Sequence, residues 1–230
     1  KRAAKDELNV EIGEISLLRT TDTPSLALKA ISNQRMGTTS LNRLDKESIA
    51  SAVGEVMSLM EAGSPDPAYD IGTKTGGSFK TGAAEPNRDQ MFQRLNEMVE
   101  KTRRETPKIK LEGAAVEFNR SYGVLLNSNG TDPAAESRYY GAMAFFTAQD
   151  GKKSSSFNYA GGSLKDLSQP IHGLFGLSEL LRESTEQLDT KSVPQKFVGD
   201  VIVTQHCLMD LLGPLLVHLG DQSLISGTSI

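Results

Sequence analysis

The sequence predicts an α+β protein: an N-terminal domain of helices packed on a mixed or antiparallel sheet, followed by the start of a mainly β C-terminal domain. Apolar residues recur at helical spacing within residues 45–63 and again within residues 89–104. Between residues 109 and 147 they instead alternate with polar residues, as they do in strands. Helical spacing returns after Pro170, so strands and helices occupy separate stretches of the chain.

This pattern divides the chain into two regions. Residues 1–190 are expected to form the N-terminal and central α+β region, and residues 191–230 the beginning of the C-terminal domain. Lys1 is not a methionine, and Ile230 lies in a stretch rich in serine, glycine and threonine. We therefore expect both ends to be cuts in a longer chain.

Composition excludes several classes of function. The 25 basic and 29 acidic residues are well mixed and leave a formal charge of −4, so direct nucleic-acid binding is not expected. There is neither a secretory leader nor an apolar run of about 18 residues, so no membrane segment is expected. The single cysteine, Cys207, excludes an internal disulfide framework and makes the cytoplasm the default compartment.

The N-terminal elements follow in order. Residues 7–18 alternate loosely and predict one strand, and residues 24–32 predict a second, shorter strand. Asp45 is a good N-cap for a helix that Gly63 and Pro65 end. The apolar stripe of this helix predicts its core face: Ile49, Val53, Val56, Met57 and Met60.

A second amphipathic helix is expected to begin near Asp89 and to end before Pro107, with Arg103 and Arg104 complementing its dipole. Residues 72–84, between the two helices, are rich in glycine and threonine but lack the Gly-Lys-Ser/Thr ending of a phosphate loop, so a flexible linker or lobe is expected there. The core face of the second helix comprises Met91, Phe92, Leu95, Met98 and Val99.

The middle of the chain predicts an antiparallel sheet. Gly113 shifts the phase of the alternation, as a bulge would. Turn residues at 127–130 and 150–151 bracket an apolar run over residues 139–147.

The last part of the chain returns to helices. Leucines recur at helical spacing after Pro170, a short apolar strand is expected over residues 197–203, and a leucine-rich helix follows. Pro214 lies within this last helix, where it marks either a helix boundary at Gly213 or a bend that shapes a wall.

The residues themselves predict no active site. His206 and Cys207 are neighbours in sequence and would point about 100° apart on a helix, which is poor geometry for a thiol and its base. His172 and His218 are isolated, and Glu183 and Glu186 have the spacing of solvent-facing acids on one helix. No zinc-binding spacing of histidine or cysteine occurs, so we assign no catalytic, cofactor-binding or metal-binding residue.

Three stretches resemble a known family. The first reads R-M-G-T-T-S at residues 35–40 and is followed by the helix and S-P-D-P at residues 64–67. The second reads N-S-N-G at residues 127–130 with S-S-F-N-Y at 155–159, and the third reads G-D-V-I-V at 199–203 with L-L-G-P-L-L at 211–216. In this order they resemble the TldD/PmbA family of peptide-maturation proteases, also known as modulators of DNA gyrase.

The resemblance implies a subunit without zinc. The catalytic TldD-type subunit carries an H-E-x-x-x-H motif, whose two histidines and glutamate would fall on Gly213, His218 and Pro214. Only His218 is retained. Glycine has no side chain to ligate a metal, and proline cannot act as a general base. The sequence therefore resembles the PmbA-type (TldE-type) partner, and zinc is expected in a TldD-like partner subunit.

The resemblance also implies a function. A TldD-like subunit supplies the metal, and the PmbA-type subunit contributes to binding of unfolded peptides and to complex formation, with a homodimer as a further possibility. Two alternatives stay open: a metallopeptidase whose ligands lie outside this sequence, and a non-proteolytic regulatory protein acting on a gyrase-linked or toxin–antitoxin system.

Overall fold

The structure is a computed structural model that describes residues 1–11, 14–73, 76–83, 85–192, 195–196, 198–204 and 207–229. Contacts divide the chain into two compact units, Lys1–Thr190 and Lys191–Ile230, each of which is described by itself. Helices and strands occupy separate stretches of the first unit, which confirms the α+β class. In chain order, the elements of the first unit are β1 (Arg2–Glu11), β2 (Glu14–Pro24), β3 (Leu26–Ser32), β4 (Arg35–Leu41), α1 (Lys46–Ala62), β5 (Ser78–Thr81), α2 (Arg88–Glu105), β6 (Ile109–Val124), β7 (Ala134–Asp150), β8 (Lys153–Ser154), β9 (Asn158–Leu164), η1 (Ile171–Gly173), α3 (Leu177–Glu186) and η2 (Gln187–Asp189).

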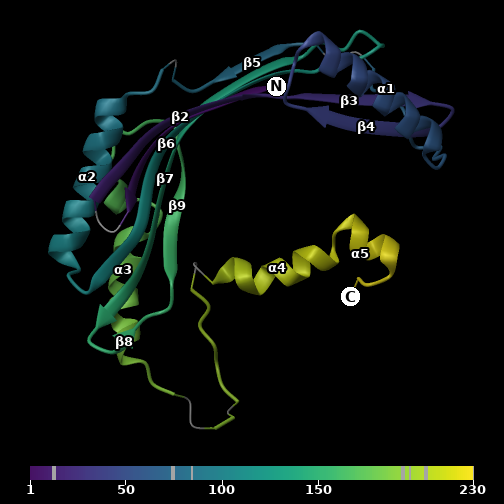
Figure 1. Ribbon diagram of the computed structural model, residues 1–230. Helices are drawn as coiled ribbons and strands as arrows, with labels where there is room; N and C mark the ends of the chain where they lie inside the picture. The colour runs from purple at the N-terminus through teal and green to yellow at the C-terminus, as the bar shows by residue number, and fades with distance from the viewer. Residues whose placement is uncertain are drawn as a thin grey trace. The chain divides into compact units, whose positions relative to one another are not determined.

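A large sheet forms the centre of the first unit (Figure 1). Its strands run in the order β2-β1-β6-β7, and β5, β8 and β9 all pair with β7. Every pairing is antiparallel except that of β5 with β7, so the sheet is mixed. The register between β6 and β7 shifts between Leu111 and Gly113, which confirms the predicted bulge.

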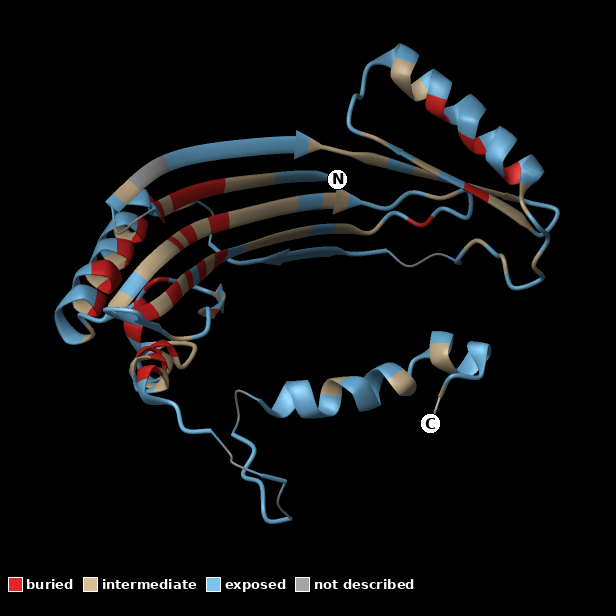
Figure 2. Ribbon diagram, turned by 60° about the horizontal axis from the view of Figure 1, so that its bottom comes forward, coloured by how far each residue is buried: buried red, intermediate tan, exposed pale blue. Residues whose placement is uncertain are grey.

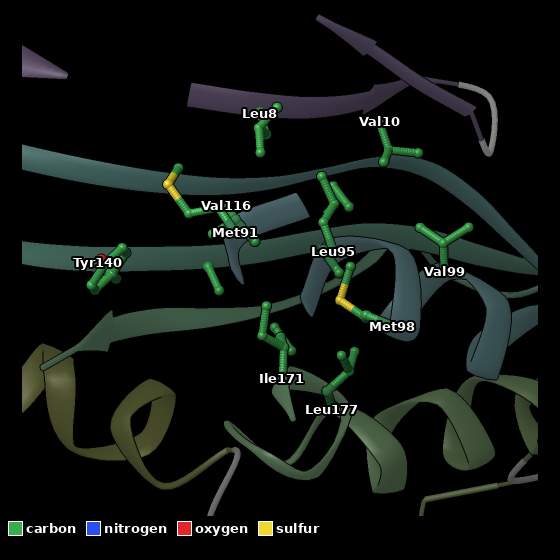
Figure 3. Packing of buried hydrophobic residues seen from close by; sticks show 14 of the residues in the cluster. Leu8, Val10, Met91, Leu95, Met98, Val99, Val116, Tyr140, Ile171 and Leu177 are labelled. Carbon is green, nitrogen blue, oxygen red and sulfur yellow. The ribbon is translucent and has the colours of Figure 1, made fainter. Parts of the chain in front are cut away.

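Helices α2 and α3 cover one face of this sheet (Figures 1 and 2). The predicted core residues of α2 are buried, except that Phe92 is half-exposed. They meet alternate residues of the strands, because side chains two apart lie on one face of a sheet (Figure 3). The largest fully buried apolar side chains of the first unit are Phe118, Phe146, Met91, Leu95, Met98, Leu167 and Leu181.

Two consecutive residues of β1 have buried carboxylates. Asp6 is fully buried and binds Arg88 Nη2 at 2.7 Å, Arg120 Nη2 at 3.2 Å and Thr20 Oγ1 at 2.6 Å. Burial by itself favours the neutral acid, but these hydrogen bonds and the two positive charges outweigh it and lower the pKa of Asp6. Glu7, on the opposite face, contacts Lys5 and Arg19 and also has a lowered pKa despite its burial.

Strands β3 and β4 and helix α1 form a small lobe, which we call the hairpin lobe. The predicted N-cap is confirmed, since the side chain of Asp45 accepts the amide hydrogen of Ser48 at 2.9 Å. Of the predicted apolar stripe, Val56 and Met60 are buried, whereas Val53 and Met57 are exposed. The two-stranded sheet is too narrow to cover the wider stripe.

In the hairpin lobe, the backbone of β4 lies very close to the backbone of α1. A Cβ at Gly37 would lie 2.5 Å from the backbone nitrogen of Met60 and still closer to the carbonyl oxygen of Val56. Gly37 is itself buried. Only glycine therefore lets β4 lie this close to α1.

Two predictions for the N-terminal half were wrong in detail. Residues 7–18 do not form one strand: β1 ends at Glu11, β2 begins at Glu14, and the two strands pair antiparallel. A loosely alternating stretch does not by itself show where one strand ends and the next begins. The expected linker at residues 72–84 contains a strand, β5, because Ala134 to Ser137 of β7 offer it a parallel edge.

The regular elements in the described part of the second unit are two helices, α4 (Leu208–His218) and α5 (Asp221–Ser226). The predicted strand at residues 197–203 is wrong for residues 198–203, which have no regular structure, and Phe197 lies outside the description. Val198 and Ile202 are almost fully exposed, and β-branched residues form a strand only where a neighbouring strand can pair with them. No helix in the described ranges is both long and apolar enough to span a membrane.

Candidate functional site

His172 lies on η1 of the first unit, whereas Cys207 and His218 lie at the two ends of α4 in the second unit. Cys207 is exposed at the N-terminus of α4, and His206 lies outside the described residues. His172 is buried on η1, where burial and, less strongly, the charge of Lys101 lower its pKa against the opposing effect of Glu105. Its Nε2 atom has no hydrogen-bond partner within the described part of the chain. A lone neutral imidazole of this kind is a core side chain.

The acids and arginines that the sequence singled out lie on helix surfaces. Glu186 forms an ion pair with Arg182, and Glu183 lies 3.9 Å from the same guanidinium. Arg103 pairs with Glu100 at 2.7 Å, one turn earlier on α2. These are exposed pairs within single helices, which contribute little to stability and form no catalytic geometry.

The residues of α4 do not fit a zinc site. Gly213, Pro214 and His218 all lie on this helix, which continues through the proline. His218 Nδ1 lies 3.0 Å from the carbonyl oxygen of Thr228, and the other two residues have no side-chain atom that could ligate a metal. In the portion of the chain that is described, no group of three or more histidine, cysteine, aspartate or glutamate residues could hold a metal ion.

A hollow on the first unit lies beside β3. We call it the β3 groove; its volume is about 590 Å³. One side is formed by the hairpin lobe and the other by two loops, residues 70–73 and 125–131. Leu125 and Leu126 are well exposed in it, which is unusual for two adjacent large apolar side chains. The lining residues are Ala27, Leu28, Lys29, Ile31, Thr38, Asp70, Ile71, Gly72, Thr73, Leu125, Leu126, Asn127, Ser128 and Thr131.

The predicted turn at residues 127–130 is confirmed and fixes the loop side of the groove. The side chain of Asn127 accepts the amide hydrogens of Asn129 and Thr131 at 2.9 and 3.0 Å and donates to the carbonyl of Gly72 at 2.9 Å. Gly130 takes the left-handed conformation that the turn requires, with φ of 75°. Asn127 therefore stabilises both its own turn and, through Gly72, the neighbouring loop.

Two further bonds join the loops. Asn129 Nδ2 donates to the carbonyl of Ile71 at 2.9 Å, and Thr131 Oγ1 donates to the carbonyl of Thr73 at 3.2 Å. Thr131 is 3% exposed, so its hydroxyl is held at the base of the loop. Three consecutive carbonyls, at residues 71–73, are thus satisfied by side chains of a single turn.

Two of the three sequence stretches behind the family resemblance meet at this groove. Thr38 belongs to the stretch at residues 35–40, and Asn127 and Ser128 belong to the turn. Sequence reasoning missed Lys29, residues 70–73 and the adjacent pair Leu125 and Leu126. The one local signal was that pair, because two large apolar residues directly before a polar turn cannot both face a sheet interior.

Replacing Asn127 by alanine is expected to loosen the β3 groove. The variant loses three hydrogen bonds, two of them exposed and one part-buried, which corresponds to about 2 kcal/mol of local stability. Hydrogen exchange at the amides of residues 125–131 and thermal unfolding measure the effect. Asn127→Asp is the matched control, because it keeps both acceptor bonds and loses only the donation to Gly72. Equal effects of the two variants would show that the turn does not depend on the accepted bonds.

Comparison with solved structures finds proteins of similar fold. TldE from Thermococcus kodakarensis matches with a TM-score of 0.61 and 16% identity over 81% of this chain and 42% of that protein. A protein from Bacteroides thetaiotaomicron described as a modulator of DNA gyrase matches with a TM-score of 0.61 and 17% identity. It covers 84% of this chain and 45% of that protein.

A third match, to a protein from Thermotoga maritima described in the same way, has a TM-score of 0.59 and 11% identity over 84% of this chain and 44% of that protein. No family model and no curated protein matches the sequence. The chain spans less than half the length of the three solved structures named here. The expected resemblance is therefore confirmed in the fold: this chain folds like part of TldE and of the modulators of DNA gyrase.

Proposed function

We propose that this chain is part of a TldE-type (PmbA-type) subunit that binds unfolded peptides and a TldD-like partner and does not itself cleave peptide bonds. The observation that carries this proposal is the likeness to TldE over 81% of the chain, together with the residues of α4 that stand where the zinc motif would fall. At 16% identity the likeness concerns the fold, so the role is argued from residues.

The chemistry of α4 supports a non-catalytic role. A zinc peptidase needs three protein ligands and a general base near the metal. At the positions where the TldD-type motif would fall, this helix offers one imidazole, on His218, whose Nδ1 contacts the carbonyl of Thr228. Zinc and the activated water would then belong to the partner subunit. The described residues of this chain contribute a groove, not a reaction centre.

The remaining features fit complex formation in the cytoplasm. A chain with one cysteine does not depend on an oxidising compartment. The leucines of α4 are each more than a third exposed within the second unit, and such an apolar face is typical of an interface. A TldD-like subunit is the partner we propose for it, with a second copy of this chain as the competing partner.

The test is cleavage of a fluorogenic, unstructured peptide by this protein, by a TldD-like subunit carrying H-E-x-x-x-H, and by the mixture. We expect no cleavage by this protein alone and chelator-sensitive cleavage by the mixture that exceeds that of the TldD-like subunit alone. A TldD-like subunit with its motif histidines replaced serves as the control and should abolish the activity of the mixture. Chelator-sensitive cleavage by this protein alone would contradict the proposal and place metal ligands outside the described residues.

A second function is favoured by the descriptions of two relatives. The matched proteins from Thermotoga maritima and Bacteroides thetaiotaomicron are described as modulators of DNA gyrase. A regulatory protein that acts by association would show no stimulation of cleavage with any TldD-like subunit. It would instead form a stable complex with another protein, which size-exclusion chromatography with purified gyrase measures directly.

A further inference from the structure

Strand β3 pairs with β4 along one edge, and the backbone groups on its other edge point away from β4. The hairpin turns at Asn33 and Gln34, both with positive φ, so Ser32 and Arg35 close it as a hydrogen-bonded pair. In an antiparallel ladder, hydrogen-bonded and non-hydrogen-bonded pairs alternate along the strand. The residues of β3 whose N–H and C=O groups point away from β4 are therefore Ala27, Lys29 and Ile31.

These three residues all line the β3 groove. Their side chains lie on the face of the hairpin opposite α1, because Gly37 of the alternate set faces that helix. One stretch of strand thus presents side chains to this hollow, together with backbone groups that have no partner among the described residues. The pairing of β3 with β4 runs through the whole strand without a shift in register, so the edge is regular.

The groove also carries an unpaired positive charge. Lys29 is exposed and makes no hydrogen bond or ion pair within the described ranges. Asp70 lines the groove too, but its carboxylate accepts the amide hydrogen of Ile71 at 2.7 Å. On many edge strands, the sole role of a lysine is to keep the edge soluble. Here, however, the edge opens into a groove whose loop side is apolar at Leu125 and Leu126.

We propose that the β3 groove binds an extended peptide segment, which pairs with the free edge of β3 through the backbone of Ala27, Lys29 and Ile31. An acidic side chain of the peptide lies opposite Lys29, and apolar side chains two residues away on either side face Leu125 and Leu126. This inference rests on the proposed function and names the surface that would receive the unfolded peptide. Backbone pairing gives affinity with few sequence requirements, which suits a protein that handles unfolded chains.

A single strand fits this place better than a second copy of the protein. The loops at residues 70–73 and 125–131 bound the groove and are joined by three side-chain bonds. A second copy that paired through its own β3 would bring its hairpin and its own loops into the same space. A peptide brings one strand only, at the 4.7–4.9 Å spacing typical of a sheet.

The first experiment tests backbone pairing without altering the protein. A fluorescein-labelled peptide, Thr-Val-Thr-Glu-Thr-Val-Thr with blocked ends, is titrated with the 230-residue protein and followed by fluorescence anisotropy. The Val, Glu and Val residues at positions two, four and six face β3 in the proposed register. N-methylation of the amides of those residues should weaken binding by about tenfold or more, since it removes hydrogen bonds and adds bulk at the edge. N-methylation of the Thr amides at positions three and five should leave binding unchanged.

The second experiment tests the register through charge. The Lys29→Glu variant should prefer a peptide with Lys at position four over the Glu peptide, reversing the preference of the parent protein severalfold. Lys152→Glu is the matched control, because Lys152 lies in the turn after β7 and away from the groove. Far-UV circular dichroism of both variants confirms that they fold.

Each outcome decides the inference. N-methylation effects that do not alternate, or a charge preference that Lys29→Glu leaves unreversed, would overturn it, and so would failure of the parent peptide to bind at millimolar protein. Such failures leave the proposed function standing, because stimulation of a TldD-like subunit is measured independently. Conversely, alternating effects without any stimulation would place the peptide correctly and refute the partner role.

Discussion

Replacing Asp6 by alanine is expected to lower the free energy of unfolding by about 3 kcal/mol, the lower end of the range for breaking a buried ion pair. Asp6 is fully buried and holds Arg88, Arg120 and Thr20 together. Removing it leaves two guanidinium groups without their shared partner. The loss stays at the lower end because both arginines retain contact with water. Denaturation in guanidinium chloride measures the change.

The control for this variant is Asp22→Ala. Asp22 also lies on the hairpin of β1 and β2 and also binds an arginine, Arg2, but both side chains are exposed. Exposed pairs of this kind are weak, so we expect no measurable change in the midpoint of unfolding. A similar loss in both variants would mean that burial does not set the strength of the Asp6 cluster.

Replacing Gly37 by valine is expected to separate α1 from the hairpin, at a cost of about 3 kcal/mol. The new side chain would meet the backbone of Val56 and Met60, which cannot rotate away as a side chain can. Hydrogen exchange of α1 should therefore accelerate, while exchange in α2, which packs on the large sheet, should not change. Peptide binding at the β3 groove should weaken as well, because the hairpin forms one side of it.

Gly54→Ala on the same helix is the matched control. A Cβ at Gly54 meets no atom within 4 Å, and alanine is the better helix former. We expect this variant to be more stable than the parent by up to about 1 kcal/mol. Slower exchange of α1 in Gly37→Val than in the parent would contradict the close-packing argument.

Local patterns predicted most helices of the first unit correctly, because the spacing of apolar residues within a helix follows the helical period. Asp45 and the glycine that follows α1 mark that helix, and the apolar stripe of α2 marks its buried face. Pairing between distant strands has no such local signature. Nothing in residues 2–11 indicates that β1 lies beside β6, since each strand carries only its own alternation.

The groove was harder still to predict. It forms where β3, residues 70–73 and residues 125–131 meet, and the bonds that join them run from side chains to backbone carbonyls. Carbonyls are the same in every residue, so the sequence does not show which one a given asparagine will bind. The predicted strand failed at residues 198–203 for a related reason, because β-branched residues favour a strand without indicating which other strand would pair with it.

The pairing of β1 with β6 also sets the order in which the protein can fold during synthesis. Arg2 pairs with Tyr122, so β1 cannot complete its pairing until the intervening chain and β6 have been made. The hairpin lobe, by contrast, closes over contacts that are near in sequence and can form while the ribosome is still translating β6. Until then β1 has no β6 beside it, so Asp6 and Glu7 are without Arg120 and the rest of the folded first unit around them. Those two charged residues would keep β1 from joining other nascent chains, a protection that ends when β6 arrives and Arg120 neutralises Asp6.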